Sequence, residues 1–177
     1  MLKELYHGTD KDFERFDKNL LGGSDAIDQY GSGFYFYSVK SKTAMHGSLR
    51  LYCNVDINKA IAHDDQLELS FDQIHSLLCA CPDLEDKLSN FGDIDYDGFD
   101  EVLTMAANQY CDMPFLDSVN MIGNDFFNNN DVHLLLTAFV KETGIDCITD
   151  LSRDIYVILT AQQIDITKSI NELDDNE

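Results

Sequence analysis

The chain has 177 residues, of which 44% are apolar, and its 12 basic and 33 acidic side chains give a formal net charge of −21. This apolar fraction excludes a disordered acidic tail and predicts one globular domain with a buried core. Because a surface with this much negative charge repels phosphate backbones, we expect no direct binding to nucleic acid. It suits solubility, or imitation of a nucleic acid toward a basic partner.

No run of apolar residues approaches the roughly 20 that a membrane span requires. Residues 1–5 also lack the apolar core of a signal peptide. The cysteines are odd in number and scattered, at Cys53, Cys79, Cys81, Cys111 and Cys147. This pattern fits a reducing compartment better than a disulfide framework. We therefore expect a cytoplasmic protein without membrane partners.

The first third of the chain predicts three strands and a short helix. Residues 2–6 form the first expected strand, and the aromatic run 33–38 forms the second. Residues 41–46 predict the helix, and residues 49–55 predict a third strand with alternating apolar side chains. The polar stretch 10–30 between the first two strands contains a Gly-Gly-Ser-Asp run, which indicates a mobile loop.

From about residue 64 to residue 144 the apolar residues recur at helical spacing. Gly144 is expected to end the last helix. Residues 146–149 and 155–159 then predict strands, and the last dozen residues, which are acidic, are expected to fray. The order of strands, helices and strands predicts a single α+β domain over residues 1–177. Its sheet joins the two ends of the chain, and residues 64–144 form a helical insertion.

The first chemical signal is Tyr6-His7-Gly8-Thr9, where a strand ends in an imidazole, a bare backbone and a hydroxyl group. Glycine permits close backbone approach, so its N–H and C=O groups can pair with a flat carboxamide. The imidazole of His7 and the hydroxyl group of Thr9 can then bind ribose hydroxyl groups. Taken alone, a histidine at a strand end is more often structural than functional.

The second signal is the run Gly31-Ser32-Gly33-Phe34-Tyr35-Phe36, a tight turn that leads into an aromatic strand. Tyr35 is expected to project opposite to its two phenylalanine neighbours, which fill a core. Its ring can stack on a heteroaromatic ring, for about 0.5–1.5 kcal/mol beyond burial. In the following helix, Thr43 and His46 lie one helical turn apart on a common face.

The third signal is Asp154, which stands at the entry of the apolar strand Ile155-Tyr156-Val157-Ile158. Cleavage of an N-glycosidic bond passes through an oxocarbenium-like state. A fixed carboxylate that binds a ribose hydroxyl group and faces this positive charge stabilises that state more than the ground state. The alternative is a solvated carboxylate at a strand edge.

Together these segments resemble the ADP-ribosyltransferase superfamily, in its diphtheria-toxin and poly(ADP-ribose) polymerase branch, which is described by a His-Tyr-Glu triad. The run from Tyr6 to Thr9 looks like the first motif of that branch. The run from Gly31 to Phe36, followed by Ser41-Lys42-Thr43-Ala44, looks like the second, and Asp154 to Ile158 with Gln163-Ile164 looks like the third. The resemblance implies a split antiparallel β-sheet core and an enzyme that transfers ADP-ribose from NAD+. The helical middle matches none of these motifs.

The resemblance also implies the site residues. Those that would bind NAD+, as a substrate, are His7, Gly8, Thr9, Tyr35, Thr43 and His46. Catalysis would depend on Asp154, as the catalytic carboxylate, and on His7. No metal is expected. The loop 22–30 would close over the adenosine side, and residues 150–153 would contact the acceptor.

Two positions depart from the triad, because His46 replaces its tyrosine and Asp154 its glutamate. An imidazole stacks less broadly and can be charged below neutral pH, and an aspartate reaches one methylene group less. The shorter acid favours mono-ADP-ribosylation of a macromolecular acceptor, expected to be a protein. With aspartate at this position, the chain is also similar to small phage and mobile-element members of the fold, including an anti-CRISPR transferase with a comparable helical insert. A nucleic-acid-binding host complex is therefore one expected partner.

Other interpretations stay open. The chain can be a catalytically inactive acidic protein that imitates nucleic acid and blocks a basic partner surface, or a toxin that acts on nucleotides or a small molecule. An RNA 2′-phosphotransferase also uses a His-Gly-Thr step, but this chain has only three arginines to bind RNA phosphates.

Two metal sites are weaker candidates. The run from Asp93 to Gly98 resembles half a calcium loop, but Thr104 stands where that loop requires glutamate. His75, Cys79 and Cys81 lack the usual spacing of zinc ligands.

Overall fold

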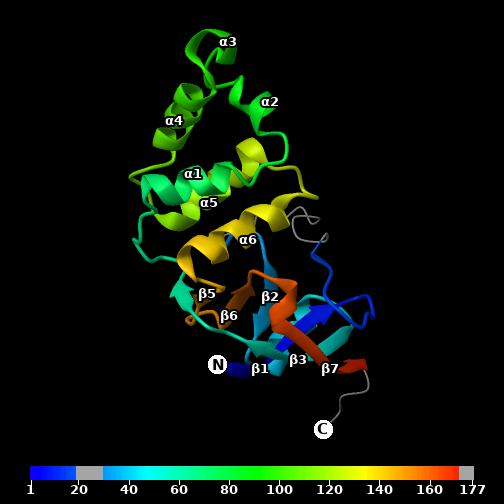
Figure 1. Cartoon of the computed structure of the whole chain (residues 1–177). Helices are drawn as coiled ribbons and strands as arrows, with labels where there is room; N and C mark the ends of the chain where they lie inside the picture. The colour runs from blue at the N-terminus through cyan, green and yellow to red at the C-terminus, as the bar shows by residue number, and fades with distance from the viewer. Residues whose placement is uncertain (19–29, 172–177) are drawn as a thin grey trace. The chain divides into compact units, whose positions relative to one another are not determined.

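The structure, a computed structural model, describes residues 1–18 and 30–171, and these fall into two compact units (Figure 1). The first, which we call the sheet unit, holds residues 1–18, 33–63 and 145–171. The second, the helical unit, holds residues 30–32 and 64–144. The two units match the expected strands and the expected helical insertion. That they form a single domain stays a prediction.

The sheet unit contains one seven-stranded sheet in the order β4-β5-β6-β2-β1-β3-β7 (Figure 1). Its strands are β1 (Leu2–Thr9), β2 (Phe34–Tyr37), β3 (Leu49–Asp56), β4 (Ala60–Ala62), β5 (Cys147–Asp150), β6 (Ile155–Ile158) and β7 (Ile164–Asn171). Neighbouring strands are antiparallel except for β4 and β5, which are parallel. The sheet therefore joins segments from both ends of the chain, as the sequence predicts.

The expectation that the last dozen residues fray is wrong for their first half, because β7 continues to Asn171. β7 pairs with β3, which is almost entirely buried, so main-chain hydrogen bonds hold a segment whose side chains are mostly polar. A register shift between Tyr52 and Cys53 leaves Thr167 without a ladder partner, and its hydroxyl group donates to the Tyr52 carbonyl oxygen at 3.0 Å. This bulge interrupts the alternation by which a strand is identified in sequence.

Side-chain alternation divides β1 and β2 between the two faces of the sheet. Leu5 and Phe36 are fully buried on one face, and the ring of His7 lies on the same face, 5.5 Å from that of Phe36. Tyr6 and Tyr37, which are paired in the ladder, lie on the other face. The expected helix 41–46 is a 3₁₀-helix, η2 (Lys40–Met45), and it packs on that second face.

The helical unit consists of α1 (Phe71–Leu78), α2 (Leu84–Leu88), α3 (Ile94–Asp97), α4 (Phe99–Gln109), α5 (Phe115–Phe126) and α6 (Val132–Thr143). Ser70 and Gln73 form a capping box at the start of α1. Gly144 ends α6 in the left-handed conformation, with φ 70°, so this prediction is confirmed. Stacked rings of Phe115 and Phe139, 6.0 Å apart, belong to the core of this unit. Within the described residues, no helix is long and apolar enough to cross a membrane.

Candidate functional site

The three sequence motifs lie on the adjacent strands β6, β2 and β1. Tyr37 of β2 pairs with Tyr6 of β1 on one side and with Ile155 of β6 on the other. The strands that lead into His7 and away from Asp154 are thus separated by β2 alone, which places them roughly 10 Å apart. The fold brings the first and third motifs to the same region of the sheet.

The ladder between β1 and β2 is short. In the described residues these strands pair at one position, Tyr6 with Tyr37, whereas β1 pairs with β3 from Leu2 to Thr9. Beyond Tyr6 the side chain of His7 bridges the two strands, with Nδ1 2.8 Å from the carbonyl oxygen of Tyr35. A carbonyl oxygen only accepts, so Nδ1 carries the proton and Nε2 carries the lone pair.

The surroundings of His7 keep its ring neutral. Burial lowers the pKa of His7 below its ordinary value of 6.5, and the nearby His46 lowers it further, while the bond to Tyr35 opposes this shift. Within residues 1–18 and 30–171, no group donates a hydrogen bond to Nε2. At pH 7 this nitrogen is therefore a hydrogen-bond acceptor.

Gly8 lies directly against η2. A Cβ atom at this position would collide with the carbonyl oxygen of Thr43 and lie 2.9 Å from the Cβ atom of His46. Only glycine lets β1 and η2 approach so closely. Because Gly8 has no side chain, the backbone of β1 lies next to Thr43 and His46, both of which are expected to bind NAD+.

Thr43 and Thr9, both expected to contact NAD+, form hydrogen bonds within the protein. Thr43 is fully buried; its hydroxyl group donates to the Lys40 carbonyl oxygen at 2.7 Å and accepts from Nε of Arg50 at 2.9 Å. Thr9 closes a turn, because its hydroxyl oxygen accepts from the Lys11 amide at 3.1 Å. In this structure Thr43 supports η2, and its expected contact with NAD+ stays a prediction.

The aromatic groups of the second motif are arranged as the sequence predicts, with one addition. Phe34 and Phe36 contact Phe16 on one face, and Tyr35, which is partly exposed, projects from the other. The addition is Tyr37: its ring stacks on His46 at 5.3 Å, and its hydroxyl group lies 2.7 Å from Nε2 of His46. Alternation along the strand, which gives Tyr35 and Tyr37 the same face, is the signal that could have identified it.

Asp154 joins β6 to the segment between β2 and η2. Its carboxylate accepts hydrogen bonds from the backbone amides of Ser38, at 3.1 and 3.2 Å, and Val39, at 2.9 Å, and from the Ser38 hydroxyl group. Nζ of Lys42 lies 4.0 Å away and also donates to the Arg153 carbonyl oxygen. The side chain of Asp154 keeps 14% of its surface exposed. It is both a structural clamp and an accessible anion.

The backbone of Asp154 has φ 62°, in the left-handed region. Aspartate, whose side chain is short and polar, tolerates this conformation better than most residues. Its short side chain also suits a carboxylate that must bond to amides on the neighbouring strand. These two constraints give a local reason for an aspartate at this position.

The expected loop 22–30 lies outside the described residues except for Tyr30. The turn 150–153, expected to contact an acceptor, is held by Asp150, whose carboxylate accepts from the Ser152 amide at 2.9 Å and the Arg153 amide at 3.1 Å. Arg153 has Nε 3.7 Å from the same carboxylate, while Leu151 is 71% exposed. The turn thus presents an apolar side chain beside Asp154.

The described residues contain no group of three or more His, Cys, Asp or Glu side chains that could hold a metal ion. His75 and Cys79 lie 3.7 Å apart, but the Cys81 thiol donates to the Phe126 carbonyl oxygen instead. In the run that resembles a calcium loop, the Asp97 carboxylate accepts from the Asp93 amide at 3.3 Å.

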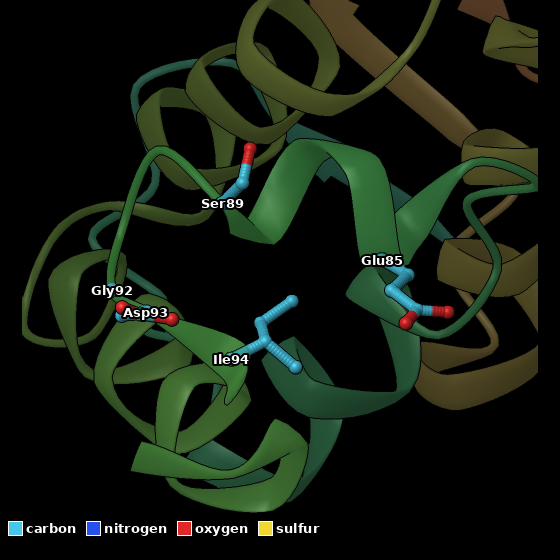
Figure 2. A pocket seen from close by; sticks show the side chains of 5 residues that line it. All are labelled: Glu85, Ser89, Gly92, Asp93 and Ile94. Carbon is cyan, nitrogen blue, oxygen red and sulfur yellow. The ribbon is translucent and has the colours of Figure 1, made fainter. Parts of the chain in front are cut away.

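An open hollow of about 420 Å³ lies in the helical unit between α2 and α3 (Figure 2). It is lined by Glu85, Ser89, Gly92, Asp93 and Ile94. None of these belongs to the three motifs. Two carboxylates would repel the pyrophosphate of NAD+, so this hollow is not a candidate for the dinucleotide.

No protein-family profile matches the sequence, and no curated protein matches it significantly. A solved structure described as the crystal structure of an anti-CRISPR protein is weakly similar, with a TM-score of 0.38 and 13% sequence identity over 96% of each chain. We therefore base the functional proposal on the site alone.

Proposed function

We propose that the chain is an NAD+-dependent mono-ADP-ribosyltransferase with an ADP-ribosyltransferase-like split sheet. The observation that supports this best is the meeting of the three motifs on β1, β2 and β6, where the β1–β2 ladder ends after one pair. Segments more than 100 residues apart in sequence supply a neutral imidazole on β1 and a carboxylate beside β6, and only β2 separates these two strands.

In this proposal each residue has a separate task. The backbone of Gly8 pairs with the carboxamide of nicotinamide, and Tyr35 stacks on its ring, for about 0.5–1.5 kcal/mol. Nε2 of His7 accepts a hydrogen bond from a ribose hydroxyl group. Thr43 and His46 position the backbone of η2 against Gly8.

The reaction breaks the bond between C1′ of ribose and the pyridinium nitrogen. Nicotinamide leaves with the electron pair and becomes neutral, and C1′ acquires oxocarbenium character. A nucleophile of the acceptor then bonds to C1′ and loses its proton. The carboxylate of Asp154 stabilises the positive charge while it develops. The carboxylate accepts hydrogen bonds from three donor groups and keeps 14% of its side-chain surface exposed, and the sugar would approach it there.

We further propose that the acceptor is a host protein with a basic, nucleic-acid-binding surface, such as a subunit of a CRISPR effector complex. The support is electrostatic, because a chain with net charge −21 is attracted to such a surface and repelled by nucleic acid itself. Leu151, beside Asp154, offers an apolar contact for the same partner.

The test is nicotinamide release from labelled NAD+, with and without a bacterial lysate, followed by mass spectrometry of the labelled protein. Asp154→Asn is expected to abolish release. Asp146→Asn is the matched control, because that carboxylate also clamps two successive amides, Asn58 at 3.0 Å and Lys59 at 3.0 Å, at the other end of the β5–β6 hairpin. Both variants should lose about 1–3 kcal/mol of stability.

Equal, partial losses of activity in the two variants would mean that Asp154 acts only as a clamp. An absence of NAD+ turnover by the folded wild-type protein, with lysate present, would reject the transferase.

A second candidate function, an acidic binding protein without catalysis, is favoured by one observation. Residues 64–144 contain 17 acidic and 2 basic side chains. Binding of a basic partner without NAD+, weakened by salt and equal in wild type and Asp154→Asn, would support it.

A further inference from the structure

Phe16 lies at the centre of an aromatic cluster around His7. Its ring centroid is 5.1 Å from that of His7, 5.1 Å from Phe34, 5.4 Å from Phe36 and 5.0 Å from Phe13. Only 8% of its surface is exposed. Phe13 and Phe16 lie in the polar stretch 10–30, where no motif or periodicity marks them as site residues, so this cluster is a feature that the structure adds.

The two phenylalanines are the apolar members of a charged segment, residues 10–18, whose other side chains are exposed. The segment is fastened at its start, where Asp10 accepts a hydrogen bond from the Ser48 amide at 2.9 Å and Lys11 donates to Thr9. Burial of a phenylalanine side chain contributes about 1.5–3 kcal/mol. The segment is therefore held over His7 by Phe16 as well as by the hydrogen bonds at its start.

Three contacts restrain the imidazole of His7. The Tyr35 carbonyl oxygen binds Nδ1, Phe16 meets the ring edge-on at an interplanar angle of 77°, and Phe36 meets it at 49°. A flip of the ring would break the bond to Tyr35 and push the imidazole against the two phenylalanine rings. With all three contacts present, the direction of Nε2 is fixed.

We infer that Phe16 is a positioning residue, which fixes the orientation of the imidazole of His7 and holds Nε2 toward the sugar of the bound dinucleotide. This inference rests on the role proposed above for His7. Phe16 itself touches His7 and does not touch the reacting atoms. Removal of its ring admits water beside His7 and lets both tautomers form, since the apolar wall that disfavours a charged or rotated imidazole is then absent.

Phe13 provides an internal comparison. Its ring is 6.4 Å from that of His7 and is partly exposed, so it shields the imidazole less than Phe16 does. The titratable group whose charge acts on His7 is His46, on η2, and substitution of Phe16 leaves it in place. A change in the titration of His7 in the variants therefore results from the loss of the phenylalanine ring beside it.

The experiment compares Phe16→Ala, Phe16→Leu and Phe13→Ala in the full chain. Nitrogen-15 NMR of the histidine rings gives the tautomer and the titration of His7, and steady-state kinetics give KM and kcat for NAD+. In Phe16→Ala we expect mixed tautomers, titration closer to 6.5, and a KM raised about tenfold, with kcat changed less than about threefold, as for lost uniform binding. In Phe16→Leu the KM and the tautomer of His7 should return most of the way to their wild-type values. Phe13→Ala should change KM less than about twofold.

An unchanged tautomer and titration of His7 in Phe16→Ala would overturn the inference, whatever the kinetics. Faster turnover in Phe16→Ala would also overturn it, because Phe16 would then obstruct NAD+. If Phe16→Ala does not fold, the same readouts on Phe16→Leu decide, with a smaller change of the same sign expected. If His7 responds as expected but the wild type does not consume NAD+, the positioning role stands and the proposed transferase fails.

Discussion

Between residues 64 and 144 the chain carries 17 acidic and 2 basic side chains, whereas the described residues of the sheet unit carry ten of each. The candidate site, with its neutral imidazole and half-buried carboxylate, lies in the sheet unit, whose described residues carry no net charge. The negative charge of the chain is concentrated in residues 64–144, which contain none of the three motifs. This comparison separates chemistry from electrostatic attraction: changes in one unit should affect NAD+ turnover, and changes in the other should affect partner binding.

The largest expected difference between the units is in NAD+ turnover, after one glycine in each unit is replaced by alanine. In Gly8→Ala the new Cβ atom collides with the Thr43 backbone, so β1 and η2 must separate. We expect a loss of about 1–3 kcal/mol in stability and about a hundredfold fall in NAD+ turnover from misplacement of the site.

The matched control for Gly8→Ala is Gly123→Ala, within α5 of the helical unit. There the nearest atom is the end of a flexible side chain, Cδ2 of Leu135, at 3.3 Å. Alanine also favours a helix interior by about 0.5–1 kcal/mol. Turnover should stay at the wild-type level, and unfolding curves and a nicotinamide-release assay measure both effects. Equal losses in both variants would remove the functional difference between the units.

A second prediction uses pH. His7 has a pKa below 6.5 in the folded chain, and about 6.5 when unfolded, so the unfolded chain binds the proton more readily. The stability due to neutral His7 is therefore complete above pH 6.5. It declines as the pH falls below 6.5, by at most about 1.4 kcal/mol per pH unit.

NAD+ turnover should accordingly stay level from pH 8 to 6.5 and fall only below 6.5, while His7→Asn should lose this dependence. Binding of a decalysine peptide should not change down to pH 5.5, because exposed carboxylates titrate below that range. Turnover that is already half lost at pH 6.5 would contradict a buried, neutral His7.

The last prediction concerns exposed charges, whose removal should hardly change stability but should weaken peptide binding more in one unit than in the other. Asp64→Asn with Glu68→Gln removes two exposed charges of the helical unit, and Asp56→Asn with Asp165→Asn removes two from the sheet unit. Neither pair should change stability by more than about 0.5 kcal/mol per site. Affinity for decalysine at low salt, measured by titration calorimetry, should fall more for the helical pair. Equal reductions would show that the whole chain attracts the peptide uniformly.

Much of the sheet unit could be predicted from sequence, because its strands alternate or are strongly apolar. This pattern is enough to predict β1, β2, β3, β5 and β6. β7 was not predictable, since a bulge at Thr167 and a polar composition conceal it, and its stability depends on β3.

The candidate site was predictable only in part. The spacing of the motifs brings His7, Gly8 and Tyr35 to neighbouring strands, and the structure agrees. The partners that restrain these residues were not predictable, because they depend on tertiary packing. Phe16 lies in a stretch without periodicity, and the clamp of Asp154 on the amide of Val39 joins distant segments through backbone groups that carry no sequence signal.

The position of β2 between β1 and β6 has a consequence for synthesis of the chain on the ribosome. Ser38 and Asp154 are 116 residues apart, so one edge of β2 has no partner until almost the whole chain has been translated. Residues 64–144 are continuous and can fold before that moment, while the unpaired edge is open to aggregation. The nascent chain therefore acquires its acidic surface first, and the carboxylate of Asp154 arrives only when β6 closes the sheet.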